Sequence, residues 1–305
     1  HIHHHCIHES LVSTLTLSIS VTTSSITATA STGSIFFIIK EIEVTNNSEI
    51  LGTTCCGGFY GGRSSSDGIL HFGSFCLDGD AGTNELPHVC LRLGLTDYRT
   101  FVGTNLSSQW EQFLVTSQDD CVRCRHTSSP LGNAAVIETS DQKIIVLRRS
   151  DNVGEFPGHY VFPGGHPEPM SVGIDSHQLE KDGDALNKKV TQEMFDSITR
   201  EVVEETGIPA SSLSTPLFIG ISRRELNVRP AMFFFIKCSH HSDDIPRLYS
   251  SAEDAFESTQ LHTVSLEELK TMTSRMPGCH QGGFALYELL LQRLKSTNET
   301  PLTST

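Results

Sequence analysis

The segment from residue 190 to residue 209 limits the fold most strongly, because its apolar residues recur at the spacing of an α-helix. These residues are Val190, Met194, Ile198 and Val202, with Phe195 beside them. Such a stripe indicates a helix that buries one face. Gly207 and Pro209 follow the stripe and predict that the helix ends there.

The flank of this helix carries a cluster of glutamates. On a helical wheel, Glu201 and Glu205 lie together beside the apolar stripe, and Glu204 lies further round, near Glu193 and Arg200. A solvated acidic face is the simplest interpretation. The alternative is a bound cation, because crowded carboxylates repel one another, and Mg²⁺ or Mn²⁺ suits carboxylate oxygens with room for water. Arg200 would then orient the carboxylates without touching the metal.

Strands and helices alternate around this segment. Residues 133–139 and 143–149 read as a strand hairpin, and a short strand at 159–162 runs into the glycine-rich loop FPGGHPEP. A second pair of strands is expected at 217–225 and 231–239. Helices are expected at 265–272 and 284–295. This mixed order predicts an α/β fold with layers on both sides of a sheet.

The first 70 residues differ in composition from the rest. Between Leu11 and Ser34, 14 of 24 residues are Ser or Thr, and the chain does not begin with Met. We interpret residues 1–70 as a low-complexity leader, either disordered or a wrongly assigned start, with an organelle-targeting peptide as the alternative. Residues 71–125 then form a small leading α/β subdomain, 126–297 the main domain and 298–305 a tail.

The charge balance limits the partners. Lys and Arg number 22 against 36 Asp and Glu, a net charge of −14, which argues against binding to nucleic acid. The sequence has no apolar run of 18 residues, so no membrane span is expected. The nine cysteines form no framework and are interpreted as reduced thiols of a cytoplasmic protein. A small anionic substrate that arrives with a divalent cation fits this charge.

The string from Arg200 to Ile208 matches R-E-U-x-E-E-x-G-U, with U apolar, at every specified place. Ordinary residue usage makes such a match rarer than about one in a million per position. Together with Gly165 it resembles the Nudix hydrolase signature, G-x5-E-x7-R-E-U-x-E-E-x-G-U. The family pattern sets its glycine and arginine 14 positions apart, whereas here they are 35 apart, which is 21 more. The first glutamate of the pattern is expected at Gln192, and Glu193, one position away, is the candidate to replace it.

Further segments extend the resemblance over about residues 71–295: LRLGLTDYRTFVGTN, RCRHTSSPLGNAAVIE, ISRRELNVRPAMFF and PGCHQGGFALYELL. They resemble a plant branch of the family that is related to the animal UDP-glucose/UDP-galactose diphosphatase. The resemblance implies a Nudix α/β/α sandwich with a mixed sheet, plus the small leading α/β element. It also implies metal-dependent hydrolysis of the pyrophosphate bond of a nucleoside diphosphate sugar, of UDP-hexose or GDP-mannose type, to a nucleoside monophosphate and a sugar 1-phosphate.

The resemblance also implies roles for individual residues. The metal, Mg²⁺ or Mn²⁺, would be held by Glu201, Glu204 and Glu205, with Arg200 as their catalytic partner. The loop and its supports would be Gly164, Gly165, Glu168, Glu193 and Gly207. The candidates for substrate binding are Arg148, Arg149, Arg223, Arg224, Arg229, Tyr98 and Arg99.

Other interpretations stay open at this point. Each arginine could instead form a surface salt bridge, and Tyr98 could serve in packing. Two other functions fit the same residues. One is a Nudix pyrophosphatase for ADP-ribose, NADH or oxidised nucleotides, and the other is a non-catalytic sensor that binds nucleotides. The sequence gives no indication of the oligomeric state.

Overall fold

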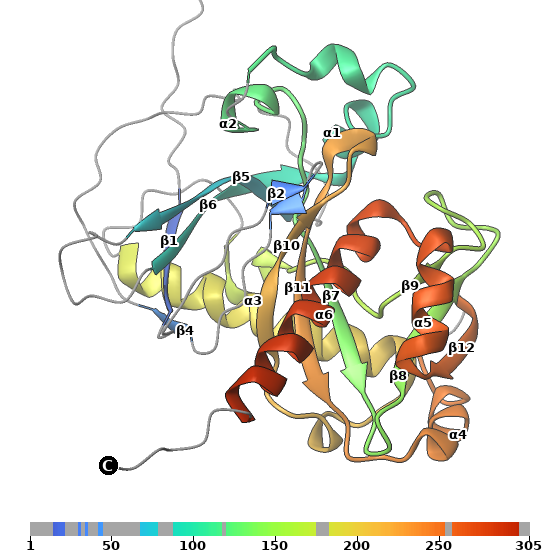
Figure 1. The fold of residues 1–305 in the computed structure, drawn as a ribbon. Helices are drawn as coiled ribbons and strands as arrows, with labels where there is room; N and C mark the ends of the chain where they lie inside the picture. The colour runs from blue at the N-terminus through green and yellow to red at the C-terminus, as the bar shows by residue number, and fades with distance from the viewer. Residues whose placement is uncertain are drawn as a thin grey trace, which may run out of the picture.

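The computed structural model of the chain is built on a mixed β-sheet with helices on both faces (Figure 1). The strand order is β10-β11-β7-β8-β12, and β9 pairs with β8. The strands span Gly132–Glu138 (β7), Ile144–Arg149 (β8), Tyr160–Val161 (β9), Leu217–Arg223 (β10), Pro230–Lys237 (β11) and Ser258–Val264 (β12). β7 and β11 run parallel and the other pairs run antiparallel.

The structure describes residues 15–21, 30–31, 34–35, 42–44, 68–78, 88–117, 120–174, 183–253 and 258–298. Most of the predicted leader and nearly all of the predicted tail therefore lie outside the described residues. The leader contributes the short strands Leu15–Val21 (β1), Ala30–Ser31 (β2), Ser34–Ile35 (β3) and Ile42–Val44 (β4). In the described part of the chain, no helix has the length and apolar character needed to cross a bilayer.

The central strands bury both of their faces. Along β11, Phe234 and Ile236 pack with α3, whereas Phe233 and Phe235 pack with α5 and α6. Successive side chains of a strand point to opposite faces, so a strand covered on both sides is apolar throughout. The covering helices span Gly183–Thr206 (α3), Leu266–Met272 (α5) and Gly278–Asn298 (α6). The predicted α/β/α sandwich is confirmed.

Helix α3 buries the stripe that the sequence predicted. Val190, Met194, Ile198 and Val202 are each at most 1% exposed. The helix ends at Thr206, and Gly207 adopts the left-handed conformation with φ of +70° while its N–H bonds to Val203 O at 2.8 Å. The predicted end is therefore confirmed. Of the long insert, the part from Gly183 onward is helical and extends α3 towards the N-terminus.

The predicted hairpin of β7 and β8 is only partly formed. The two strands pair at Glu138 and Ile144 and then separate. The glycine-rich loop lies along the freed edge of β7, where Ala135 N bonds to Pro163 O at 2.8 Å and Asn133 N bonds to Gly165 O at 3.0 Å. The loop is thereby held as part of the sheet.

The leading element packs into the same core as α3. Its strands span Gly68–Asp78 (β5) and His88–Asp97 (β6), and they join β1 and β4 in a second sheet. Leu70, Phe72, Leu91 and Leu93 contact the same apolar cluster as the stripe of α3. The helices Tyr98–Gly103 (α1) and Asp120–Arg123 (α2) complete the element. The α-helix Ile245–Tyr249 (α4) was not predicted from the sequence, and neither was β12.

Candidate functional site

A cavity of about 720 Å³ opens where the glycine-rich loop meets the C-terminal half of α3. Its other walls come from α1, the β8–β9 loop, the β10–β11 turn and the start of α6. Segments from 98 to 280 in the sequence therefore contribute to one cavity. This cavity contains two groups of opposite charge, described below as the acidic wall and the basic wall.

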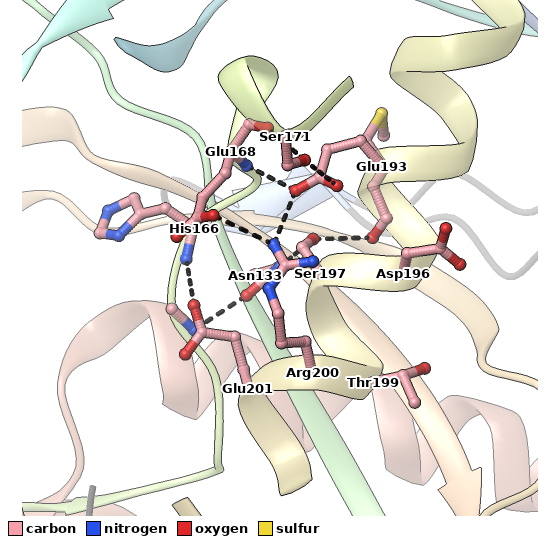
Figure 2. A network of polar contacts seen from close by, with 12 residues as sticks. Asn133, His166, Glu168, Ser171, Glu193, Asp196, Ser197, Thr199, Arg200 and Glu201 are labelled. Carbon is pink, nitrogen blue, oxygen red and sulfur yellow. Dashed lines mark hydrogen bonds and ion pairs between the residues drawn. The ribbon is translucent and has the colours of Figure 1, made fainter. Parts of the chain in front are cut away.

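The acidic wall is formed by Glu201 and Glu205 of α3. Glu205 Oε2 accepts a hydrogen bond from Gly164 N at 2.7 Å, and Glu201 Oε1 accepts one from His166 N at 3.1 Å. Figure 2 shows the loop running past this part of α3. A Cβ atom added at Gly165 would overlap the carboxylate of Glu201. A larger residue at Gly165 would therefore push the carboxylate of Glu201 out of this position.

Asn133 of β7 connects the glycine-rich loop to α3 through two hydrogen bonds. Its Oδ1 accepts from Gly165 N at 2.9 Å, and its Nδ2 donates to Ser197 Oγ at 2.8 Å (Figure 2). Both side chains are buried. The sequence reasoning missed both residues, because their meeting depends on the packing of α3 against β7.

The structure shows how Glu193 and Gln192 differ in orientation. Glu193 is 2% exposed and accepts from Glu168 N at 2.7 Å, from Arg200 Nη2 at 2.9 Å and from Ser171 Oγ at 2.7 Å (Figure 2). Gln192 is exposed and bonds to Asp196. Glu193 therefore turns inward, and both of its oxygens hold the loop and Arg200.

The remaining carboxylates influence the acidic wall through their charge. Burial raises the pKa of Glu201 to about 7, and the nearby charges of Glu204 and Glu168 act in the same direction. The hydrogen bond from His166 N and the charge of Arg200 oppose the rise. Glu204 itself does not line the cavity. The charged form of Glu201 is thus poorly stabilised by its surroundings.

A divalent cation fits the acidic wall. Among the described residues, no three His, Cys, Asp or Glu side chains gather as a ready-made metal cluster. Mg²⁺ needs no such cluster, because it is held by one or two carboxylates together with water and substrate phosphates. Glu201 and Glu205 supply those two carboxylates, and a cation beside them would favour the charged form of Glu201, which burial disfavours.

The basic wall is formed by Arg149, Arg224 and Arg229. Glu155 of the β8–β9 loop forms ion pairs with Arg224 and Arg229. Arg229 also donates to His166 Nε2 in the glycine-rich loop. Three of the six arginines predicted to bind substrate therefore line the cavity.

The other predicted substrate residues are placed differently. Arg148 and Arg223 do not line the cavity, and the guanidinium of Arg223 lies over the ring of Phe72 at 5.4 Å. Arg99 also lies outside the cavity, on the exposed side of α1. Tyr98 is 58% exposed and does line the cavity. It is therefore the member of the predicted pair that can contact a ligand there.

His280, near the start of α6, lines the cavity and was also missed. Its Nδ1 accepts from Phe162 N at 3.2 Å. Burial lowers its pKa to about 3, and the charges of Arg149, Arg224 and Arg229 act in the same direction. The ring is therefore neutral, with Nε2 as its proton-bearing nitrogen. The segment PGCHQGG was noticed in the sequence only through the family resemblance.

Comparison with known proteins places the chain among close relatives, although no family model matches it. It is 83% identical to Nudix hydrolase 9 of Arabidopsis thaliana over 240 residues, which is 77% of each chain. It is 36% identical to the human uridine diphosphate glucose pyrophosphatase NUDT22 over 211 residues, 67% of this chain and 66% of that protein. The solved MutT protein of Methanosarcina mazei shares 20% identity over 56% of this chain and 95% of its own. Its TM-score of 0.34 is too low to add to the sequence matches.

Proposed function

This chain belongs to the Nudix hydrolase family as a pyrophosphohydrolase, and we propose that its substrate is a nucleoside diphosphate sugar. A UDP-hexose is the first candidate. The products would be a nucleoside monophosphate and a sugar 1-phosphate. One observation carries this proposal: the acidic and basic walls line a single cavity. A diphosphate needs both a cation site and phosphate-binding donors. The human relative at 36% identity is by name a UDP-glucose pyrophosphatase, which supports the choice of sugar nucleotide.

The residues of the two walls would divide the work. Glu201 and Glu205 would hold Mg²⁺ or Mn²⁺, with Arg200 and Glu193 fixing the loop beside them. When bound, such an ion neutralises the diphosphate and lowers the pKa of a coordinated water. Arg149, Arg224 and Arg229 would bind phosphate oxygens, because guanidinium groups match their geometry.

The outer part of the cavity would bind the base or the sugar. Tyr98 is exposed at the cavity, and Phe101 behind it lies under the guanidinium of Arg229 at 5.1 Å. An exposed aromatic ring offers a stacking surface to a planar base. The neutral Nε2–H of His280 is a donor suited to an uncharged oxygen acceptor.

The test is a substrate panel with two substitutions. Turnover of UDP-glucose, UDP-galactose, GDP-mannose, ADP-ribose, NADH and an oxidised nucleotide is compared by kcat/KM, in Mg²⁺ and in EDTA. We expect a UDP-hexose to be preferred and EDTA to abolish turnover. Glu201→Gln and Glu205→Gln should each lower kcat by about 100-fold or more, because each removes charge from the cation site.

Asp196→Asn provides the matched control, because Asp196 is an exposed carboxylate of the same helix that does not line the cavity. Its kcat and melting temperature should equal those of the wild type. Near-normal turnover in a folded Glu201→Gln, Glu205→Gln double variant would refute the metal assignment. A preference for ADP-ribose, NADH or an oxidised nucleotide would refute the nucleotide sugar as substrate and identify that compound in its place. Nucleotide binding without turnover would identify a sensor.

A further inference from the structure

One residue of the β8–β9 loop contacts all three arginines of the basic wall. The side chain of Glu155 pairs through Oε1 with Arg224 Nη2, and through Oε2 with Arg229 Nη1 at 2.6 Å. Its backbone oxygen accepts from Arg149 Nε at 2.9 Å. The side chain is 14% exposed. Glu155 therefore lies at the centre of the basic wall, with most of its side chain shielded from solvent.

The guanidinium groups of Arg224 and Arg229 each form hydrogen bonds through their N–H groups and pack one face against an aromatic ring. Arg224 lies over the ring of Phe156 at 4.9 Å, and its Nε donates to Asn227 Oδ1 at 2.6 Å. Arg229 lies over the ring of Phe101 at 5.1 Å. Two cations this close repel each other, and a carboxylate between them offsets that repulsion while fixing their planes.

The two arginines still have N–H groups for a ligand. Within the described residues Arg224 uses one N–H on Asn227 and another on Glu155, and Arg229 uses one on Glu155 and another on His166. A guanidinium carries five N–H groups, so each arginine keeps most of them. Neither side chain has a buried nitrogen without a partner among the described residues. Both arginines line the cavity, so we expect their remaining donors to be available to a ligand bound there.

The contact also reaches the acidic wall. Arg229 bonds to the ring of His166, and the backbone N–H of His166 bonds to Glu201 Oε1 at 3.1 Å. Glu155, Arg229, His166 and Glu201 are therefore linked in series across the cavity. A change at Glu155 would release Arg229 and loosen the loop that contacts Glu201.

We infer that Glu155 is a positioning residue, which orients Arg224 and Arg229 towards the diphosphate without touching the substrate itself. This inference rests on the proposed function for its ligand class. The competing idea is that Glu155 occupies the arginines in place of phosphate and leaves when substrate arrives. The geometry favours positioning, because withdrawal of the carboxylate would break both ion pairs and the contact with Asn227 Nδ2 at 3.4 Å together.

The experiment measures binding of pyrophosphate in Mg²⁺ by isothermal titration calorimetry, using the full chain. Glu155→Gln should weaken binding about tenfold or more, because the arginines lose the group that orients them. KM for the nucleotide sugar should rise more than kcat falls. Glu155→Asp keeps the charge with a shorter side chain and should restore part of the affinity. It also carries the test if Glu155→Gln does not fold.

Glu225→Gln is the matched control, because Glu225 is the exposed carboxylate next to Arg224 in the sequence. It should bind pyrophosphate as the wild type does. A coupling test follows: if Glu155 acts through Arg229, adding Glu155→Gln to Arg229→Gln should change affinity by less than the sum of the two single effects.

Two results would overturn the inference. Unchanged or tighter pyrophosphate binding in folded Glu155→Gln would mean that Glu155 competes with phosphate or is irrelevant to it. Fully additive losses with Arg229→Gln would mean that Glu155 does not act through Arg229. Both results are binding measurements and do not depend on turnover. If the nucleotide sugar proposed as substrate is wrong, the substrate panel will show it, and the pyrophosphate result will still hold.

Discussion

Single residues in this site are held in place by buried polar neighbours. Glu193 supports the loop in this way, because its carboxylate accepts hydrogen bonds from Glu168 N, Ser171 Oγ and Arg200 Nη2. Asn133 performs a similar task between the loop and α3. The positions of the glutamates that line the cavity thus depend on buried polar contacts, which are worth most where water is excluded.

His280 makes the stability of the fold depend on pH. Its pKa is about 3 in the folded protein, below the ordinary value of 6.5. As pH falls below 6.5, the unfolded chain takes up a proton here that the folded chain does not, so stability decreases towards pH 3. His280→Gln keeps an acceptor for Phe162 N, and it should lose less melting temperature than the wild type between about pH 7 and pH 5.

The measurement is differential scanning fluorimetry at a series of pH values. His126→Gln is the control, because His126 is an exposed histidine that does not line the cavity, and it should follow the wild type. Equal pH dependence in His280→Gln and the wild type would show that His280 does not contribute this term.

At the level of whole elements, α3 combines the apolar face of the core with the acidic wall of the cavity. Its C-terminal end is therefore important for both. The left-handed Gly207 turns the chain away beside α4, and a Cβ atom there would overlap Leu248 O. The helix end is set by this close contact as well as by backbone preference.

Gly207→Ala should destabilise the protein by about 1–3 kcal/mol, because alanine is strained at positive φ and because its Cβ would force α4 to move. Urea unfolding measures the change. Gly103→Ala at the end of α1 is the matched control, because no atom lies within 4 Å of the added Cβ. It should change stability by no more than about 0.5 kcal/mol. Equal effects at the two glycines would contradict the proposed contact with α4.

Over the whole molecule, the leading element and the central sheet form one unit around the cavity. Asn105 follows α1 and is 1% exposed; its Nδ2 donates to Asn227 O at 2.8 Å and its Oδ1 accepts from Ser129 N at 3.2 Å. Asn227 in turn bonds to Arg224 of the basic wall. The leading element thus supports the cavity as well as covering the core.

Asn105→Ala should lower the free energy of unfolding by about 1–3 kcal/mol, because it leaves a buried carbonyl and a buried N–H without partners. It should also raise KM, since Asn227 supports Arg224. Denaturant unfolding and steady-state kinetics measure the two effects. Gln109→Ala, an exposed residue of the same segment, should change neither. A loss of stability with unchanged KM would show that Asn105 stabilises the fold but does not support substrate binding.

Patterns within short stretches of the chain were enough to predict α3, its end at Gly207, the strand pair β10 and β11 and the layered fold. These features follow from hydrophobic spacing and backbone preference, which act between residues close in sequence. Packing decided the rest. In the sheet, β7 and β8 pair only at one end, and the glycine-rich loop lies along the remaining edge of β7. The fold also brings Glu155 into contact with Arg224 and Arg229, which lie some 70 positions away in the sequence. Contacts of that range depend on which elements become neighbours, and no local pattern encodes that.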